Sequence, residues 1–332
     1  MTKLRTKGFV LGAVLVSAMF FTWACGGGGG GDGGTPPPQT MTPASMDQTT
    51  AEAATAMGMS IGDITDISGS YLDQIDVRAA GPDSQRVMPL AAWAMEKLRD
   101  GFLAGNVINE KNTSRAGSVG ESGNCDNSGA YEISGSWTGP DDPADACEVS
   151  NATLTFSLSN CRDYGESANG TINIRVNGNL CAPTGISVSF SGFSMTDNSH
   201  GLTVQANSFD ITMTALKFSG DDLTHGAIAL NGDIAVNSLS MEFYRFNEEV
   251  TVNGSEQTVT VSGSVTGDCL DGWVTFTTLA PIKSNEYSEC PYDGSVRLSG
   301  DKDMVVSFNS DGSTTIGDQT YASCTDVPDV CQ

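Results

Sequence analysis

The chain has 332 residues and carries 40 acidic residues against 16 basic ones, a net charge of −24 at pH 7. This acidity excludes the basic surface that nucleic-acid binding requires and repels anionic lipid head groups. It suits a well-hydrated surface, or one that attracts Ca²⁺ or basic partners. Hydrophobic residues make up 39% of the chain, which is sufficient for a core and argues against global disorder.

The first 25 residues have the features of an export signal. Three basic residues within the first seven precede an apolar run at 8–21, which is too short for a membrane-spanning helix of about 20 residues. A small residue, Ala24, directly before Cys25 resembles the lipobox of bacterial lipoproteins, although Thr22 stands where Leu is usual and Trp23 is bulky. The resemblance implies that residues 1–24 are a signal peptide and that Cys25 is lipidated. An ordinary secretory signal is the alternative.

Residues 25–43 have the composition of a tether. Gly26–Gly34 is glycine except for Asp32, which predicts a flexible coil, and the prolines that follow predict a stiffer, extended stretch. By resemblance to Gram-negative lipoproteins, Gly26 rather than Asp after the lipidated cysteine implies the outer membrane, with the periplasmic or external face left open. Loss of the signal leaves 13 basic and 40 acidic residues, a net charge of −27.

Residues 44–105 are predicted to be helical. Residues 46–59 are rich in Ala and Met, and 64–75 have apolar residues at three- and four-residue spacing. The strongest prediction is a helix over 89–103, because its proline suits the first turn. Its apolar stripe, which we expect to pack on a sheet, consists of Leu90, Ala94, Leu98 and Phe102.

Residues 106–332 are predicted to form an antiparallel β domain. After a polar linker at 106–124, apolar residues alternate with Ser, Thr and Asn from Tyr131 to Tyr321, with hairpin-type turn residues between the runs. A phase shift at Leu216 predicts a β-bulge. The chain is therefore mainly β: a large antiparallel sheet, either a sandwich or a curled half-barrel, with the N-terminal helices packed on it.

Eight cysteines remain after Cys25, and an even number in an exported chain predicts four disulfides. A strand of eight residues spans about 26 Å, whereas the Cα atoms of a disulfide lie within about 7 Å. Partners must therefore lie at the same end of the sheet. Counting strands between cysteines predicts Cys125–Cys161, Cys147–Cys181, Cys269–Cys324 and Cys290–Cys331.

Two loops share the pattern Asp-x-x-His-Gly. If residues 202–218 form a hairpin turning near Asn207, both loops lie at one end of the sheet, and their side chains are candidate ligands for Zn²⁺ or another divalent ion. The alternative is two polar hairpin turns, in which Asp and Asn bond to their own backbone and Gly takes a positive φ. The candidates are Asp197, His200, Asp222 and His225.

A second acidic loop, at 141–148, contains Asp141, Asp142, Asp145 and Glu148. Its clustered carboxylates suit a structural Ca²⁺ ion, and a solvated loop is the alternative. No other cofactor is indicated by any motif.

No catalytic motif accompanies these patterns: there is no Gly-x-Ser-x-Gly elbow and no nucleotide-binding loop. Trp137 and Trp273 each lie beside a glycine, where they either stack on sugars or fill the core. We expect a lipid-anchored envelope protein with a non-enzymatic structural or partner-binding role, held at the membrane by its lipid. The alternatives are a carrier of a lipid or other hydrophobic ligand between sheet and helix, and a surface hydrolase acting on glycan or ester.

Overall fold

The computed structural model describes residues 41–62, 116–125, 127–139, 148–163, 166–179, 182–197, 202–219, 222–237, 239–285 and 290–328. The predicted helix at 89–103 lies outside these residues. The helical segment is represented by one α-helix, α2 (Gln48–Gly62), within the Ala- and Met-rich stretch. Asp47 precedes it as the N-cap, its Oδ1 accepting a hydrogen bond from the Thr50 backbone N–H at 2.8 Å.

In the described part of the chain, fourteen strands follow α2. They are β1 (Ala116–Asn124), β2 (Ser128–Thr138), β3 (Ser150–Asp163), β4 (Glu166–Asn179), β5 (Ala182–Asp197), β6 (Leu202–Ser219), β7 (Asp222–Val236), β8 (Leu239–Asn253), β9 (Glu256–Gly267), β10 (Val274–Asn285), β11 (Asp293–Ser299), β12 (Asp303–Phe308), β13 (Thr314–Ile316) and β14 (Gln319–Tyr321). A short 3₁₀ helix, Cys324–Asp326, comes after β14.

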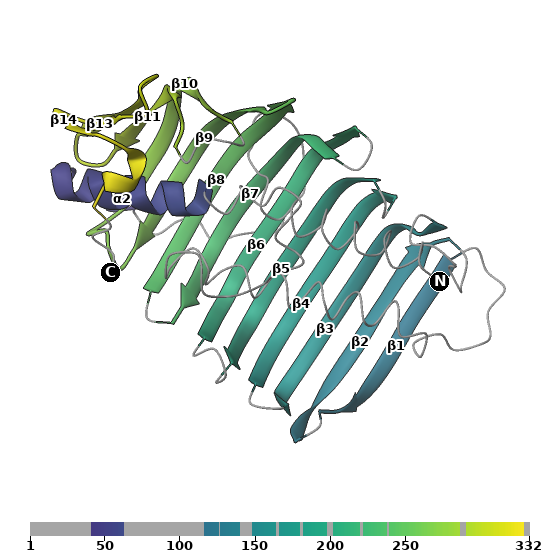
Figure 1. Ribbon diagram of the computed structural model, residues 1–332. Helices are drawn as coiled ribbons and strands as arrows, with labels where there is room; N and C mark the ends of the chain where they lie inside the picture. The colour runs from purple at the N-terminus through teal and green to yellow at the C-terminus, as the bar shows by residue number, and fades with distance from the viewer. Residues whose placement is uncertain are drawn as a thin grey trace.

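All fourteen strands belong to one sheet, in which each strand pairs antiparallel with its neighbours in sequence. The sheet is not closed, so β1 and β14 lie at opposite ends of it (Figure 1). The prediction of a mainly β chain built on a large antiparallel sheet is confirmed. Among the described residues there is no second sheet, so the sandwich was the wrong one of the two predicted architectures.

The predicted linker at 106–124 was wrong in its second half, because residues 116–124 form β1. The prediction failed because this stretch is rich in Gly and Ser, which lack the side chains that mark a strand. The pairing with β2 over the full length of β1 determines its structure instead.

Bulges in neighbouring strands lie side by side in the middle of the sheet. The register of β4 shifts at Gly170 and that of β7 shifts at Gly232. These two glycines and Gly263 of β9 have positive φ. A Cβ on Gly170, Gly232 or Gly263 would lie 2.3, 1.9 or 2.3 Å from a backbone oxygen of a neighbouring strand (β5, β6 and β8, respectively), so only glycine fits. The bulge predicted near Leu216 is present, with Ala215 at φ 53°.

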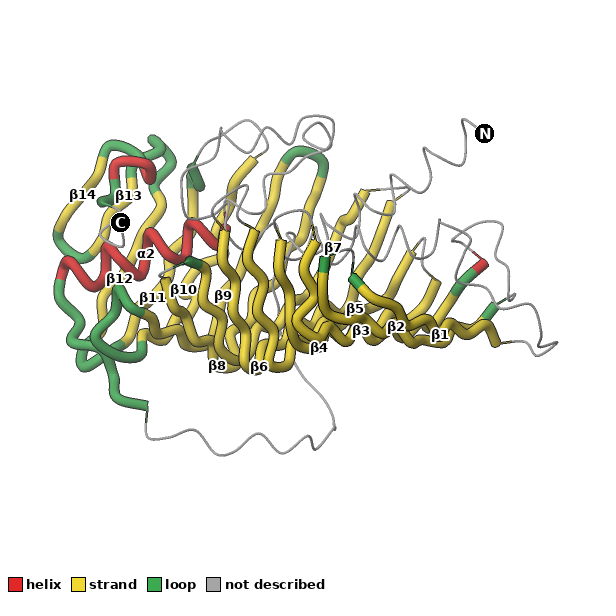
Figure 2. Tube along the Cα trace, turned by 90° about the horizontal axis from the view of Figure 1, so that it is seen from below, coloured by secondary structure: helices red, strands yellow, loops and turns green. Residues whose placement is uncertain are grey.

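One face of the sheet carries the core. The apolar residues that alternate along β3–β12 are buried on this face, whereas the Ser, Thr and Asn residues between them point to the other face. Six phenylalanine rings run across it in successive contact, with centroids 5.5–6.3 Å apart: Phe190, Phe193, Phe209, Phe243, Phe246 and Phe276. Helix α2 lies on the C-terminal part of this face, and the last strands curl around it (Figures 1 and 2).

Candidate interaction sites at the two ends of the sheet

The predicted metal-binding loops lie at opposite ends of β6. Residues 202–219 form one continuous strand of 18 residues instead of a hairpin, so Asp197, at the end of β5, and Asp222, at the start of β7, lie at opposite ends of β6. Asn207 is part of a bulge, where its backbone N–H and its Nδ2 both donate to Asp233 Oδ2, at 3.4 and 2.7 Å. The predicted four-residue site is therefore wrong.

His225 is the metal candidate whose side chain is described. Its Nδ1 lies 3.2 Å from Thr251 Oγ1 and its Nε2 lies 3.9 Å from Glu249 Oε1, both on the neighbouring strand β8. His200 and the side chains of Asp197 and Asp222 lie outside the described residues. Within the part of the chain that is described, no three His, Cys, Asp or Glu side chains gather as a metal site.

The acidic loop proposed for Ca²⁺ lies outside the described residues except for Glu148, whose side chain is exposed. Cys25 and the tether up to residue 40 lie outside them as well. Lipidation of Cys25 and a structural Ca²⁺ ion therefore stay predictions. Within the described ranges, no helix has both the length and the apolar character needed to cross a membrane.

The disulfide predicted by strand counting is present near β1, but the two predicted near the C-terminal strands are not. Cys125 is joined to Cys161, as predicted, with Cα atoms 5.4 Å apart. Cys290 is joined to Cys324, with Cα atoms 5.7 Å apart, so Cys269–Cys324 and Cys290–Cys331 were both wrong. Cys269 is itself disulfide-bonded. Cys147 and Cys181 lie outside the described residues, and their pairing stays a prediction.

The error has a definite cause in the C-terminal strands. We predicted one strand near 313–320, but this stretch is a hairpin of two strands, β13 and β14, that turns at Gly317 with φ 57°. The extra reversal returns Cys324 to the end of the sheet that holds Cys290.

The chain segment before α2 is attached to the C-terminal strands by backbone hydrogen bonds. Pro43 forms a parallel bridge with Trp273, and the backbone N–H groups of Ala44 and Trp273 donate to the carbonyls of Trp273 and Thr42, each at 2.9 Å. The Asp301 N–H donates to the Ala44 carbonyl at 2.8 Å. We call residues 42–47 the N-terminal strap.

Two aspartates complete this attachment. Asp271 Oδ1 accepts from the Ser45 N–H at 3.0 Å, and Asp301 Oδ1 accepts from the Met46 N–H at 2.7 Å. Met46 is fully buried. The strap is therefore held on one side by the loop before β10 and on the other by the loop after β11. No motif in the sequence marked it, because its partners, two aspartate carboxylates among them, lie more than 200 residues away.

Helix α2 continues the attachment over β10 and β14. Gly58 faces the ring of Phe276, where an added Cβ would lie 3.2 Å from Cε1. Buried Glu52 accepts a hydrogen bond from the Tyr321 hydroxyl, which also lies 3.5 Å from Gln48 Nε2. Burial, and then the bond to Glu52, raise the pKa of Tyr321.

At the opposite end of the sheet, β1 is the edge strand. The outer side of β1 pairs with no other strand of the described chain. Tyr131 of β2 stands directly opposite Gly123, so that a Cβ on Gly123 would lie 2.8 Å from the Tyr131 hydroxyl oxygen. Trp137 is buried and stands opposite Gly117. Trp137 therefore belongs to the core, and Trp273 lies against the N-terminal strap.

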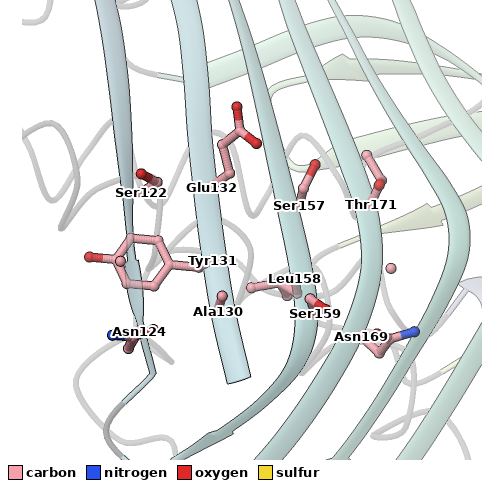
Figure 3. Close-up of a pocket in the computed structure, with 12 residues that line it drawn as sticks. Ser122, Asn124, Ala130, Tyr131, Glu132, Ser157, Leu158, Ser159, Asn169 and Thr171 are labelled. Atoms are coloured by element: carbon pink, nitrogen blue, oxygen red, sulfur yellow. The ribbon is translucent and has the colours of Figure 1, made fainter. Parts of the chain in front are cut away.

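An open depression of about 530 Å³ lies beside this end, on β1–β4 (Figure 3). A row of polar side chains crosses it, one from each strand in direct register, and these project to the same side in the figure: Ser122, Glu132, Ser157 and Thr171. Glu132 is the one carboxylate of its lining. The arrangement offers hydrogen-bonding groups but lacks the paired carboxylates of a glycoside hydrolase.

One charged residue lies on the apolar face itself. Glu248 of β8 is 5% exposed, and its neighbours on the same face of the strand, Phe246 and Val250, are each 1% exposed. No described residue forms a hydrogen bond or an ion pair with its carboxylate. Burial raises its pKa well above the ordinary value of 4.5. The alternation Phe246-x-Glu248-x-Val250 in the sequence is the signal that would have predicted a carboxyl group on this apolar face.

Comparison with protein-family models, curated proteins and solved structures finds no match for this chain. Any functional conclusion therefore depends on the sequence patterns and the geometry described above.

Proposed function

We propose that this chain is a lipid-anchored, non-enzymatic protein of the bacterial outer membrane, which holds one end of an open β sheet near the membrane and binds a partner at the other. The observation that carries the proposal is the attachment of the N-terminal strap. The strap joins the C-terminal strands, whereas the unpaired strand β1 lies at the far end of the sheet (Figure 1).

The lengths support this arrangement. Cys25 and Thr42 are 17 residues apart (42 − 25). A fully flexible chain of this length spans roughly 21–25 Å, and the stiffer proline stretch makes the tether somewhat longer. The strap is bonded to residues just before β10 and just after β11, and nine gaps separate β10 from β1 (10 − 1), so at about 4.8 Å per gap the sheet extends about 43 Å beyond the strap. A lipid on Cys25 would therefore keep the β10–β14 end close to the membrane and leave the β1 end free of it. The acidic charge of the mature chain also opposes flat contact with anionic lipid.

The experiment has two parts, both in cells that express the full chain. Membrane fractionation with labelled palmitate should show label on the wild type and none on Cys25→Ala. A photo-crosslinking amino acid is then placed at Ser122 on β1 or at Gln319 on β14. We expect protein adducts from position 122 and none from position 319. Lack of label on the wild type removes the anchor, and lack of adducts at 122 removes the binding role.

A carrier of an amphipathic ligand is the second candidate, and Glu248 favours it. A carboxyl group that bonds to no described residue, on a wide apolar face, suits a ligand that combines an apolar chain with a hydrogen-bond donor. Native mass spectrometry of protein purified without detergent would show a bound lipid in the wild type and less in Glu248→Gln. The matched control is Glu242→Gln, an exposed glutamate on the same strand. Bare wild-type protein would remove this candidate.

A further inference from the structure

We propose that the partner at the β1 end is a second copy of this chain, joined by antiparallel pairing of the two β1 strands about Gly120. The result would be a symmetric dimer with one continuous sheet. This inference names the partner of the binding role proposed above and rests on that role.

The backbone groups that β1 leaves free follow from its pairing with β2. The Cys125 N–H donates to the Gly129 carbonyl at 3.2 Å, and Cys125 and Gly129 continue the register of Asn124 opposite Ala130. In an antiparallel pair the hydrogen-bonded positions alternate, so residues 117, 119, 121 and 123 face β2. Residues 116, 118, 120, 122 and 124 therefore direct their N–H and C=O groups away from the sheet.

The free edge is held in a strand conformation although it is poor in strand-forming residues. Glycine weakens a strand because it has no side chain to pack, and three of the nine residues of β1 are glycine. The Cys125–Cys161 disulfide ties the end of β1 to β3, across β2, and Tyr131 stands over Gly123. The edge is therefore preorganised, which lowers the entropy lost when another strand pairs with it.

The sequence of β1 is compatible with itself in the antiparallel direction. The register centred on Gly120 pairs all nine residues and places Ser118 opposite Ser122, and Val119 opposite Glu121. Like charges do not face each other directly, although the chain as a whole is strongly acidic. The outward groups of the two strands form about ten backbone hydrogen bonds in this register.

Symmetry favours a second copy over a different strand. A two-fold axis through Gly120, normal to the sheet, keeps both α2 helices on the same face of the dimer and places the two strap-bearing ends at its extremities, with the paired β1 strands midway between them. The other end of the sheet has no comparable edge, since β14 has three residues and is covered by α2 through Gln48 and Glu52. Pairing through β1 alone closes at two copies and does not continue into a fibre.

The test uses the full lipidated protein. With the photo-crosslinker at Ser122, we expect an adduct of twice the chain mass whose cross-linked peptides both come from β1, and none with the crosslinker at Gln319. Adducts of another mass would support the binding role and overturn the second copy as partner. Lack of adducts at position 122 would overturn both proposals.

Proline provides the matched variant. Ser122 points its N–H outward, so Ser122→Pro removes an outward donor and leaves the bonds to β2 in place, whereas Ser122→Ala keeps the donor. Native mass spectrometry of the lipidated protein in micelles should show at least about tenfold less dimer for the proline variant than for the alanine variant. Disulfide mapping of Cys125–Cys161 verifies that both variants fold. Equal dimer fractions in two folded variants would overturn the proposal.

Discussion

The two ends of this sheet treat their edge strands differently. At the C-terminal end, β14 is three residues long, Tyr321 bonds to Glu52 of α2, and Cys324 is tied to Cys290. At the N-terminal end, β1 is nine residues long and one of its sides is unpaired within the described chain. Exposed edges favour association with other strands. Among the described residues, the edge beside the strap is therefore covered, whereas the remote edge is unpaired.

Removing the disulfides should have the largest effect on the stability of the two ends of the sheet. Their loops are nearly equal, with sequence separations of 36 for Cys125–Cys161 and 34 for Cys290–Cys324. Replacing either pair by alanine should therefore cost a similar free energy of unfolding, about 2–4 kcal/mol. The local effects should differ, as hydrogen exchange can measure. Loss of Cys125–Cys161 should speed exchange in β1–β3, and loss of Cys290–Cys324 in β11–β14 and the N-terminal strap. Identical exchange patterns would contradict the distinction between the ends.

The sequence was informative where side chains determine the structure. Alternation of apolar and polar residues predicted the antiparallel sheet, and counting strands predicted Cys125–Cys161 because the strands around it are long enough to show that alternation. The same count failed after Cys290, because a three-residue strand such as β13 is too short to show alternation. One unrecognised turn at Gly317 reversed the direction of every later element.

Other features could not be predicted because backbone groups create them. The N-terminal strap is held in part by the carbonyl and N–H groups of Trp273, which any sequence supplies. The carboxylates of Asp271 and Asp301 hold the rest, and no local pattern distinguishes them from other exposed acids. Strand β1 owes its conformation to β2 and a disulfide instead of its own residues. The metal hypothesis failed for a related reason: Asn207 and Ser208 look like a turn locally, but in β6 they form a bulge that Asp233 stabilises.

Two glycines provide a second test of the difference between the ends. A Cβ on Gly300 would lie 2.4 Å from the backbone oxygen of Ala44, so Gly300→Ala must displace the strap. A Cβ on Gly123 would meet the end of the Tyr131 side chain, which can rotate away. We expect Gly300→Ala to lower the free energy of unfolding by about 2–3 kcal/mol, and Gly123→Ala to lower it by less than about 1 kcal/mol. Chemical denaturation measures both, and equal losses would contradict the expected order.

Glu248 lies in the middle of the sheet, so a substitution there should change the stability of both ends alike. Burial raises the pKa of Glu248, so the folded protein holds this proton more tightly than the unfolded chain. The stability linked to it is complete below pH 4.5 and is lost as the pH rises through the pKa in the folded state. Glu248→Gln should therefore match the wild type near pH 4 and be about 2 kcal/mol more stable near pH 8.

Denaturant titrations at several pH values test this dependence, with the exposed Glu242→Gln as control. An equal gain at both pH values would show that the carboxyl ionises freely in the folded protein. A gain for Glu242→Gln as well would assign the effect to net charge, since the chain carries −24.

The smallest expected loss of stability comes from Asp301→Ala. This variant also tests whether the strap is what keeps β14 from pairing with other strands. Asp301→Ala removes the acceptor of the Met46 N–H and should cost about 1 kcal/mol. Asp303→Ala is the control, because its carboxylate is exposed and lies 3.8 Å from Arg297. Hydrogen exchange should accelerate in residues 44–57 of the first variant only. If the strap and α2 are what keep β14 from pairing, the photo-crosslinker at Gln319 should form adducts in Asp301→Ala that it does not form in the wild type. An unchanged pattern would mean that the short length of β14 is sufficient to prevent pairing.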